Sequence, residues 1–259
     1  MGSKIYRRFK TIEERKSFYL LKNFRKAVLD FQMIENGDKI LVGLSGGKDS
    51  ITLFKLLKLF RKIYQFDFKI VPIIVLSEIQ EEIKKNIPDL ADFVKNEGEE
   101  LIIKEIAVHP PEDYKKSLCF VCSWHRRKTL FYTAKELACN KVALGHHSDD
   151  IAETILLNLF YHGRLERMEP KMDFFDGEFT LIRPLAYLSE KVITDYAKNL
   201  SVHLTTCTCP MGNKTQRSYL KEKLYELERE IPKIKLNLFR ACDNENEFVP
   251  LRIKRKRKK

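Results

Sequence analysis

The strongest constraint on the fold of this chain is an apolar run that leads into a glycine-rich loop. Residues 39–44 read KILVGL, residues 45–50 read SGGKDS, and residues 51–64 carry apolar side chains at helical spacing. This order predicts a strand, a loop and a helix. Glycines let a backbone approach phosphate closely, and a helix N-terminus attracts anions. The loop is therefore predicted to bind phosphate, although it lacks the spacing of a Walker A loop.

Further apolar runs alternate with helical patterns along the next hundred residues. The runs lie at residues 69–76, 101–108 and 141–145, and the helical patterns lie at residues 80–96, 123–137 and 149–161. Such alternation predicts an α/β fold built on a doubly wound parallel sheet, which binds ligands at the carboxyl ends of its strands. Both residues 45–50 and residues 145–150 follow predicted strands, so we expect them at that edge.

The two ends of the chain are predicted to be helical extensions of this sheet. Residues 11–34 have the pattern of a basic amphipathic helix, and helices are expected at residues 189–199 and 215–228. The predicted organisation is a basic N-terminal helix at 1–36, a nucleotide-binding domain at 37–185, a helical C-terminal part at 186–250 and a disordered basic tail at 251–259.

The second loop, residues 145–150, reads GHHSDD and carries candidate ligands for Mg²⁺. Carboxylate oxygens suit this hard ion when it is bound to phosphates, and Asp150 is the preferred candidate. For Asp149, an ordinary role at the start of a helix is equally expected. His146 and His147 are predicted to form hydrogen bonds or pack, because no further spaced ligands accompany them.

Four of the six cysteines fall in two tight pairs, Cys119/Cys122 and Cys207/Cys209. A C-x-x-C pair serves a redox dithiol, a zinc site or an iron–sulfur cluster. The surrounding pattern does not fit the small fold of thioredoxin-like proteins, so zinc or a cluster remains. The two isolated cysteines are expected to be small buried hydrophobic residues, Cys139 and Cys242.

A formal charge of +12 and a pI near 9.3 favour a polyanionic partner, foremost nucleic acid. Basic segments at residues 7–16, 125–128 and 252–259 are predicted to contact RNA phosphates. No stretch approaches the roughly 18 apolar residues of a membrane span, and the N-terminus lacks a secretory signal. We therefore expect no membrane partner and a cytoplasmic location.

The SGGKDS loop resembles the SGGxDS signature of the N-type ATP pyrophosphatases, or PP-loop proteins. The resemblance implies an adenine nucleotide alpha hydrolase-like fold that cleaves ATP between its α and β phosphates with Mg²⁺. It assigns catalytic roles to Lys48 and Asp49, and it places Ile74 and Val75 beside adenine. The implied ATP-binding set comprises Leu44, Ser45, Gly46, Gly47, Lys48, Asp49, Ser50, Val75, Gly145 and Asp150.

Several further segments look like the tRNA 2-thiocytidine synthetase branch of that superfamily. They are residues 145–172, 182–191, 207–210 and 215–217, and the similarity covers roughly residues 20–245. The branch implies a [4Fe-4S] cluster held by Cys119, Cys122 and Cys209, with one iron open for sulfur and these cysteines essential for catalysis. The usual C-x-x-C at the third ligand is C-x-C here, which leaves Cys207 without an assigned role.

The implied function is ATP-dependent tRNA thiolation at the C2 carbonyl of cytidine 32, by adenylation and release of AMP and pyrophosphate. The implied partners are tRNA and a sulfur donor, either a cysteine desulfurase or sulfide, and a homodimer is compatible with the sequence. Alternatives within the enzyme class are 2-thiouridine synthesis and a lysidine-synthetase-like ligase. The zinc-finger 2-thiouridine enzymes carry cysteines at both ends, whereas no cysteine precedes Cys119 here. A non-catalytic RNA-binding protein with structural zinc is the alternative from another class.

Overall fold

The computed structural model describes residues 12–78, 80–108, 118–205 and 215–244. Within these ranges it describes the backbone alone at residues 12–16, 82, 118 and 119. Residues 7–11 of the predicted basic segment at 7–16, the predicted basic segment at 252–259, and the Cys207/Cys209 pair lie outside the described residues.

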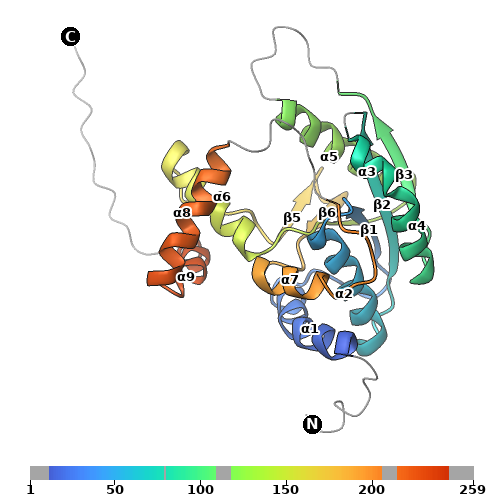
Figure 1. The fold of residues 1–259 in the computed structure, drawn as a ribbon, viewed down its shortest axis with the longest axis horizontal. Coiled ribbons are helices and arrows are strands. Elements are labelled where there is room, and N and C mark those ends of the chain that lie inside the picture. The colour runs from blue at the N-terminus through green and yellow to red at the C-terminus, as the bar shows by residue number, and fades with distance from the viewer. Residues whose placement is uncertain (1–11, 79, 109–117, 206–214, 245–259) are drawn as a thin grey trace, which may run out of the picture.

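One six-stranded sheet forms the centre of the described chain, with the strand order β3-β2-β1-β4-β6-β5 (Figure 1). All neighbouring strands are parallel except β5, which pairs with β6 in the antiparallel sense. The prediction of a doubly wound, mostly parallel sheet is confirmed. The strands are β1 (Lys39–Leu44), β2 (Lys69–Ser77), β3 (Ile102–Ile106), β4 (Lys141–Ala143), β5 (Lys171–Phe174) and β6 (Phe179–Ile182).

Helices cover both faces of the sheet because its central strands are apolar on both sides. On one face, α1 (Ile12–Asp30), α2 (Lys48–Tyr64), α4 (Ile87–Asn96) and α7 (Glu190–Ala197) enclose the larger core. On the other face, α5 (Leu118–Glu136) packs on β1, β2, β3 and β4. Successive residues of a strand face opposite sides, so Ile74 lies in the first core and Val75 in the second.

The predicted helix at residues 80–96 is divided into α3 (Glu81–Lys85) and α4, with Asn86 between them. Pro88 lies in the first turn of α4. Proline has no N–H to donate to the preceding turn and its ring clashes with it, so one continuous helix cannot pass through this position.

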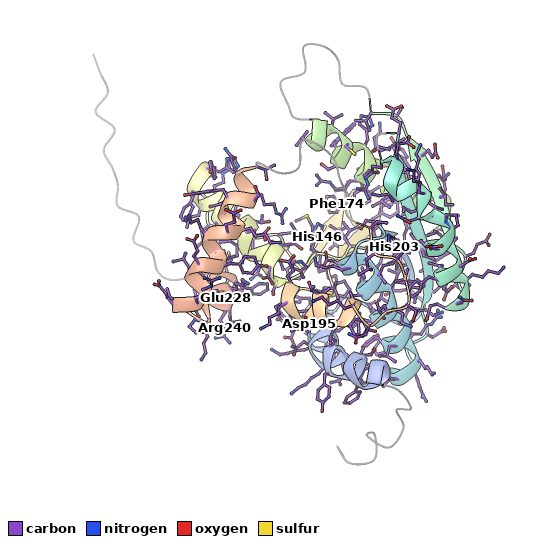
Figure 2. All side chains as sticks on the ribbon, in the orientation of Figure 1. His146, Phe174, Asp195, His203, Glu228 and Arg240 are labelled. Atoms are coloured by element: carbon purple, nitrogen blue, oxygen red, sulfur yellow. The ribbon has the colours of Figure 1, made fainter. Side chains whose placement is uncertain are left out.

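The C-terminal helices pack on α6 and lie to one side of the sheet (Figure 1). α6 spans Ser148–His162, α8 spans Gln216–Glu230, and α9 spans Ile234–Ala241. Two small apolar clusters join the three helices, one around Ile151 and Phe239 and the other around Leu156 and Leu224. Glu228 and Arg240, on α8 and α9, mark this helical group in Figure 2. α9 was not predicted.

Candidate active site

The loop between β1 and α2 is closed by its two serines. Ser45 Oγ lies 3.2 Å from Ser50 Oγ, and Ser50 Oγ donates to the Gly47 carbonyl at 2.9 Å. Gly47 caps α2 with an extended backbone, at φ −80° and ψ 160°. The first N–H groups of a helix lack intrahelical acceptors, so this end of α2 is suited to bind phosphate.

Gly46 has a backbone conformation that favours glycine, and its surroundings leave no room for a side chain. Its φ is +76°, and a Cβ at this position would lie 2.2 Å from Thr205 Oγ1. Thr205 is hydrogen-bonded to the loop twice, from its N–H to the Gly46 carbonyl at 2.9 Å and from its hydroxyl to the Ser45 carbonyl at 3.3 Å. The segment that precedes residues 206–214 is thus attached to the phosphate loop.

Lys48 lies between two carboxylates at the start of α2. Its Nζ is 3.1 Å from Asp49 Oδ2 and 3.2 Å from Glu190 Oε1. Partial burial opposes the charged form of Lys48, but Asp49 and Glu190 outweigh it and raise its pKa. The lysine is therefore a permanent cation beside the loop, as a group that neutralises phosphate must be.

The second predicted loop lies directly against the first. A Cβ on Gly145 would lie 3.0 Å from the Asp49 carbonyl carbon, so a side chain here would crowd the backbone of the first loop. His147 follows, buried at 3% exposure. Its Nε2 is 3.6 Å from Asp49 Oδ1 and 3.4 Å from Asp150 Oδ2. One imidazole thus contacts the carboxylates of both loops.

Asp150 also closes the N-terminus of α6 and binds a cation from α8. Its Oδ2 accepts the His147 backbone N–H at 3.0 Å, and its Oδ1 accepts from Arg217 Nη2 at 3.0 Å. Arg217 Nε donates to Glu153 at 2.8 Å. Burial raises the pKa of Glu153, with Arg217 opposing this rise. Asp49 and Asp150 are the carboxylates that could bind Mg²⁺ here, and His147 occupies the space between them.

Asp149 has a structural role. It is 2% exposed, and it accepts from Lys235 Nζ at 2.5 Å and from the Glu190 N–H at 2.9 Å. Burial would raise its pKa, but these hydrogen bonds outweigh burial and lower it. Asp149 thereby holds α6, α7 and α9 together. It lies in the first turn of α6, as expected for a residue at the start of a helix.

Glu190 joins the phosphate loop to α8. Besides Lys48, its carboxylate contacts Lys221 Nζ at 2.7 Å and accepts the Tyr225 hydroxyl. Burial opposes ionisation, but Lys221, Tyr225 and Lys48 lower the pKa of Glu190 to about 2. The C-terminal helical group is thus connected electrostatically to the residues expected to bind ATP.

His146 forms a hydrogen bond, as predicted for the histidine pair. Its Nδ1 lies 3.3 Å from Arg183 Nε. Burial, followed by the charge of Arg183, lowers the pKa of His146 to about 4, so the imidazole is neutral at physiological pH. Burial and the nearby Arg127 lower the pKa of Arg183 to about 10.

The cysteine sites are described only in part. Cys119 and Cys122 belong to α5, but the side chain of Cys119 lies outside the described set, as does the whole of Cys209. Cys122 is half-buried with a free thiol, and Cys139 is buried. Burial raises the pKa of the Cys139 thiol, against the charge of Lys39. Among the described side chains, no group of three or more His, Cys, Asp or Glu residues is arranged to hold a metal ion.

Comparison with known proteins identifies the family. The model of the PP-loop domain family matches residues 19–228. A tRNA-cytidine(32) 2-sulfurtransferase from Ralstonia nicotianae is 39% identical over 85% of this chain and 71% of its own length. Another from Pelobacter propionicus is 39% identical over 85% of this chain and 82% of its own length. The chain belongs to the tRNA-cytidine(32) 2-sulfurtransferase family of PP-loop enzymes. The family prediction is confirmed.

A solved structure agrees in fold with this family member. The U34-tRNA thiolase of Methanococcus maripaludis, determined with its [4Fe-4S] cluster, superposes with a TM-score of 0.69 and 23% identity. The match covers 89% of this chain and 78% of that one. At this identity the likeness shows the shared fold.

Three residues that contact the phosphate loop or the second loop were not predicted as site residues: Thr205, Glu190 and Arg217. Glu190 and Arg217 fall within segments that resemble the 2-thiocytidine branch, at residues 182–191 and 215–217. That resemblance was the available signal. Their partners lie far away in the sequence, and Arg217 is 67 residues from Asp150. The Arg217 pair follows from the packing of α6 on α8, and the Glu190–Lys48 pair from the packing of α2 on α7.

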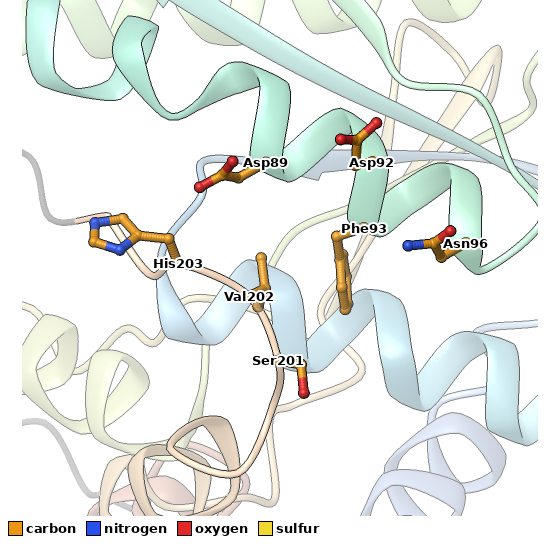
Figure 3. Close-up of a pocket in the computed structure, with 7 residues that line it drawn as sticks. All are labelled: Asp89, Asp92, Phe93, Asn96, Ser201, Val202 and His203. Atoms are coloured by element: carbon orange, nitrogen blue, oxygen red, sulfur yellow. The ribbon is translucent and has the colours of Figure 1, made fainter.

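A separate pocket of about 290 Å³ lies between α4 and residues 201–203 (Figure 3). Asp89 and Asp92 line it from α4, and His203 lines it from the opposite side. It contains none of the predicted ATP or cluster residues. Across the described helices, none is long and apolar enough to cross a membrane.

Proposed function

We propose that this chain thiolates C2 of cytidine 32 in tRNA, with ATP as the activating substrate. The observation that carries the proposal is the meeting of the two loops at His147, 3.6 Å from Asp49 and 3.4 Å from Asp150. This contact brings the phosphate loop and the second carboxylate loop together at the carboxyl edge of the sheet. Relatives named for the same reaction support the choice of substrate.

The loop at residues 45–50 is proposed to hold the pyrophosphate part of ATP. Ser45, Gly46, Gly47 and Ser50 supply N–H and hydroxyl groups, and Lys48 supplies a positive charge. Asp49 and Asp150 would hold Mg²⁺, which would neutralise negative charge on the phosphates, because oxygen ligands suit this ion. At the ends of β1 and β2, Leu44 is 2% and Val75 is 3% exposed, in keeping with apolar walls near the nucleotide.

The chemistry requires activation because the C2 oxygen of cytidine is a poor leaving group. The carbonyl oxygen attacks the α-phosphate of ATP and pyrophosphate leaves. A sulfur nucleophile then attacks C2, the C–O bond breaks, and AMP departs with the oxygen. Lys48 and the N–H groups at the start of α2 stabilise the negative charge that develops on phosphate, which is the main electrostatic requirement of phosphoryl transfer.

Cys119, Cys122 and Cys209 are proposed to ligate a [4Fe-4S] cluster. Held by these three thiolates, such a cluster would supply an iron able to bind the sulfur that the activated base receives. The segment that carries Cys209 begins directly after Thr205, whose N–H donates to the phosphate loop at 2.9 Å. The proposal thus joins the third ligand to the ATP site through a short stretch of chain.

The remaining partners follow from the same chemistry. We propose a cytoplasmic enzyme that receives sulfur from a cysteine desulfurase or from sulfide. The C-terminal part, residues 186–250, would couple tRNA binding to the phosphate loop through Glu190. A homodimer is compatible with this arrangement, and molar mass in solution measures it.

The test is a thiolation assay under anaerobic conditions. Protein reconstituted with iron and sulfide is incubated with ATP, Mg²⁺, sulfide and unmodified tRNA, and nucleosides are read by mass spectrometry. We expect 2-thiocytidine and equimolar AMP and pyrophosphate. Thiolated uridine would move the chain to U34-type chemistry. A cluster-loaded enzyme that binds ATP and tRNA but forms no thiolated product would contradict the proposal.

Matched cysteine variants test the ligand set. We expect Cys122→Ala and Cys209→Ala to lose bound iron and product. Cys139→Ala, which removes a buried thiol from the core, and Cys207→Ala should retain both. Iron retained in Cys209→Ala but lost in Cys207→Ala would reverse the choice of third ligand.

A further inference from the structure

The outer side of α5 carries two aromatic residues and a lysine at a spacing of four residues. Side chains four apart on a helix are neighbours, so Trp124, Lys128 and Tyr132 form one stripe. Trp124 is 50% and Tyr132 is 59% exposed. The opposite side of the helix is buried through Leu130 and Ala134, which belong to the apolar cluster on the sheet. The stripe therefore adds nothing to the core.

The stripe has a defined internal geometry. Lys128 Nζ lies 5.3 Å from the centre of the Trp124 ring and 5.6 Å from that of Tyr132. Both distances lie within the range of a cation–π contact. The lysine head group is thus held between two aromatic rings. The His125 ring also meets the Trp124 ring edge to face, with 5.0 Å between their centres, and half or more of each aromatic residue remains exposed.

The charge around the stripe is almost entirely positive. His125, Arg126, Arg127 and Lys128 are consecutive, and Glu136 is the one acidic residue of α5. Within the described part of the chain, no carboxylate lies at ion-pair distance from Lys128 or Arg126. A surface of unneutralised cations complements a polyanion.

We propose that Trp124, Lys128 and Tyr132 form a stacking surface for unpaired nucleotides of tRNA, an inference that rests on the proposed function. Aromatic rings stack on bases, while lysine and arginine bind the phosphates between them. A paired stem offers only phosphates and sugars, because its bases already stack on each other. The combination of open rings and cations fits a single-stranded loop better than a duplex.

The position of the stripe on the helix fits this role. Trp124 is two residues after Cys122, and Arg127, which directly precedes Lys128, is near enough to Arg183 to influence its pKa. Arg183 in turn contacts His146 in the second loop. An RNA loop on the stripe would lie along the helix that carries two of the three proposed cluster ligands.

Trp124 is the only tryptophan in the chain, so fluorescence excited selectively at tryptophan, beyond the absorption of the ten tyrosines, reports on this surface. The full-length protein is titrated with an RNA hairpin that carries the anticodon loop, and with a blunt duplex of the same stem. We expect the hairpin to quench Trp124 strongly and the duplex to leave it nearly unchanged. Equal quenching by both RNAs, or no quenching by a hairpin that binds, would overturn the stacking surface.

Variants separate stacking from general attraction. We expect Trp124→Ala and Tyr132→Ala each to raise the Kd for the hairpin roughly 10-fold or more, as the loss of one stacked base does. Trp124→Phe should recover most of the affinity. Tyr19 on α1 is the matched control, because it is also 59% exposed but lies on the other face of the sheet. Tyr19→Ala should bind as the unaltered chain does, and an equal loss in this variant would overturn the proposal.

The thiolation assay distinguishes failure of this surface from failure of the proposed function. We expect Trp124→Ala to raise the KM for tRNA with little change in kcat. An unchanged KM together with formation of 2-thiocytidine would reject the stripe and keep the function. Quenching by the hairpin without any thiolated product would support the stripe and reject the function.

Discussion

Glu190→Gln tests whether the phosphate loop is held by the C-terminal helices. In the native chain the Glu190 carboxylate contacts Lys48 at 3.2 Å and Lys221 at 2.7 Å, and its side chain is 16% exposed. Its pKa falls from 4.5 to about 2, which corresponds to about 3 kcal/mol of stabilisation by the ionised form. Gln keeps the shape but not the charge.

We expect Glu190→Gln to lower the free energy of unfolding by about 2 to 3 kcal/mol at pH 7. The folded-state pKa is lowered, so the stabilisation is complete above pH 4.5 and is lost as the pH falls toward about 2. The difference between the native chain and the variant should therefore shrink below pH 4.5. Urea denaturation at a series of pH values measures it.

The control is Asp195→Asn on the same helix, labelled in Figure 2. Asp195 is 64% exposed and lies 3.9 Å from Lys198, a surface pair expected to contribute less than about 1 kcal/mol. We also expect Glu190→Gln to form pyrophosphate from ATP more slowly, because Lys48 loses one of its two carboxylate partners. A difference in stability that stays constant from pH 7 to pH 3, or is absent at pH 7, would refute the electrostatic explanation.

Three further substitutions test the packing around the site. Gly46→Ala should abolish ATP binding, measured by calorimetry, because the new Cβ would lie 2.2 Å from Thr205 Oγ1. The control is Gly37→Ala, at φ +89° with no atom within 4 Å of the new Cβ. This variant should bind ATP normally and show only backbone strain of about 1 kcal/mol. Lys235→Met should lower the free energy of unfolding by about 3 kcal/mol, since it leaves Asp149 buried without its cation; a loss below about 1 kcal/mol would contradict this role. Thr52→Val should stabilise the chain by about 1 kcal/mol, because the buried Thr52 hydroxyl has no hydrogen-bond partner among the described residues; a lower melting temperature would count against it.

Much of the fold could be predicted because it depends on local patterns. The change from a continuous apolar run at residues 39–44 to helical spacing at residues 51–64 predicts β1, the phosphate loop and α2. β5 and β6 have four residues each and were missed, and β5 exposes much of its KMDF sequence at the sheet edge. Segments this short carry too little periodicity to be distinguished from loops. The three-residue β4 was predicted because its apolar run lies between two helical patterns.

The sequence alone also indicates the phosphate loop, the second loop and the cysteine pairs as candidate ligand groups, because the chemistry of glycine, carboxylate and thiol groups can be recognised in short motifs. Only the tertiary structure decided which distant groups complete the site. Thr205 contacts the phosphate loop from 160 residues away, and Lys235 reaches Asp149 across 86 residues. These contacts depend on how α6, α7, α8 and α9 pack together, and the amphipathic pattern of a helix specifies which side is buried but not which charge it will meet.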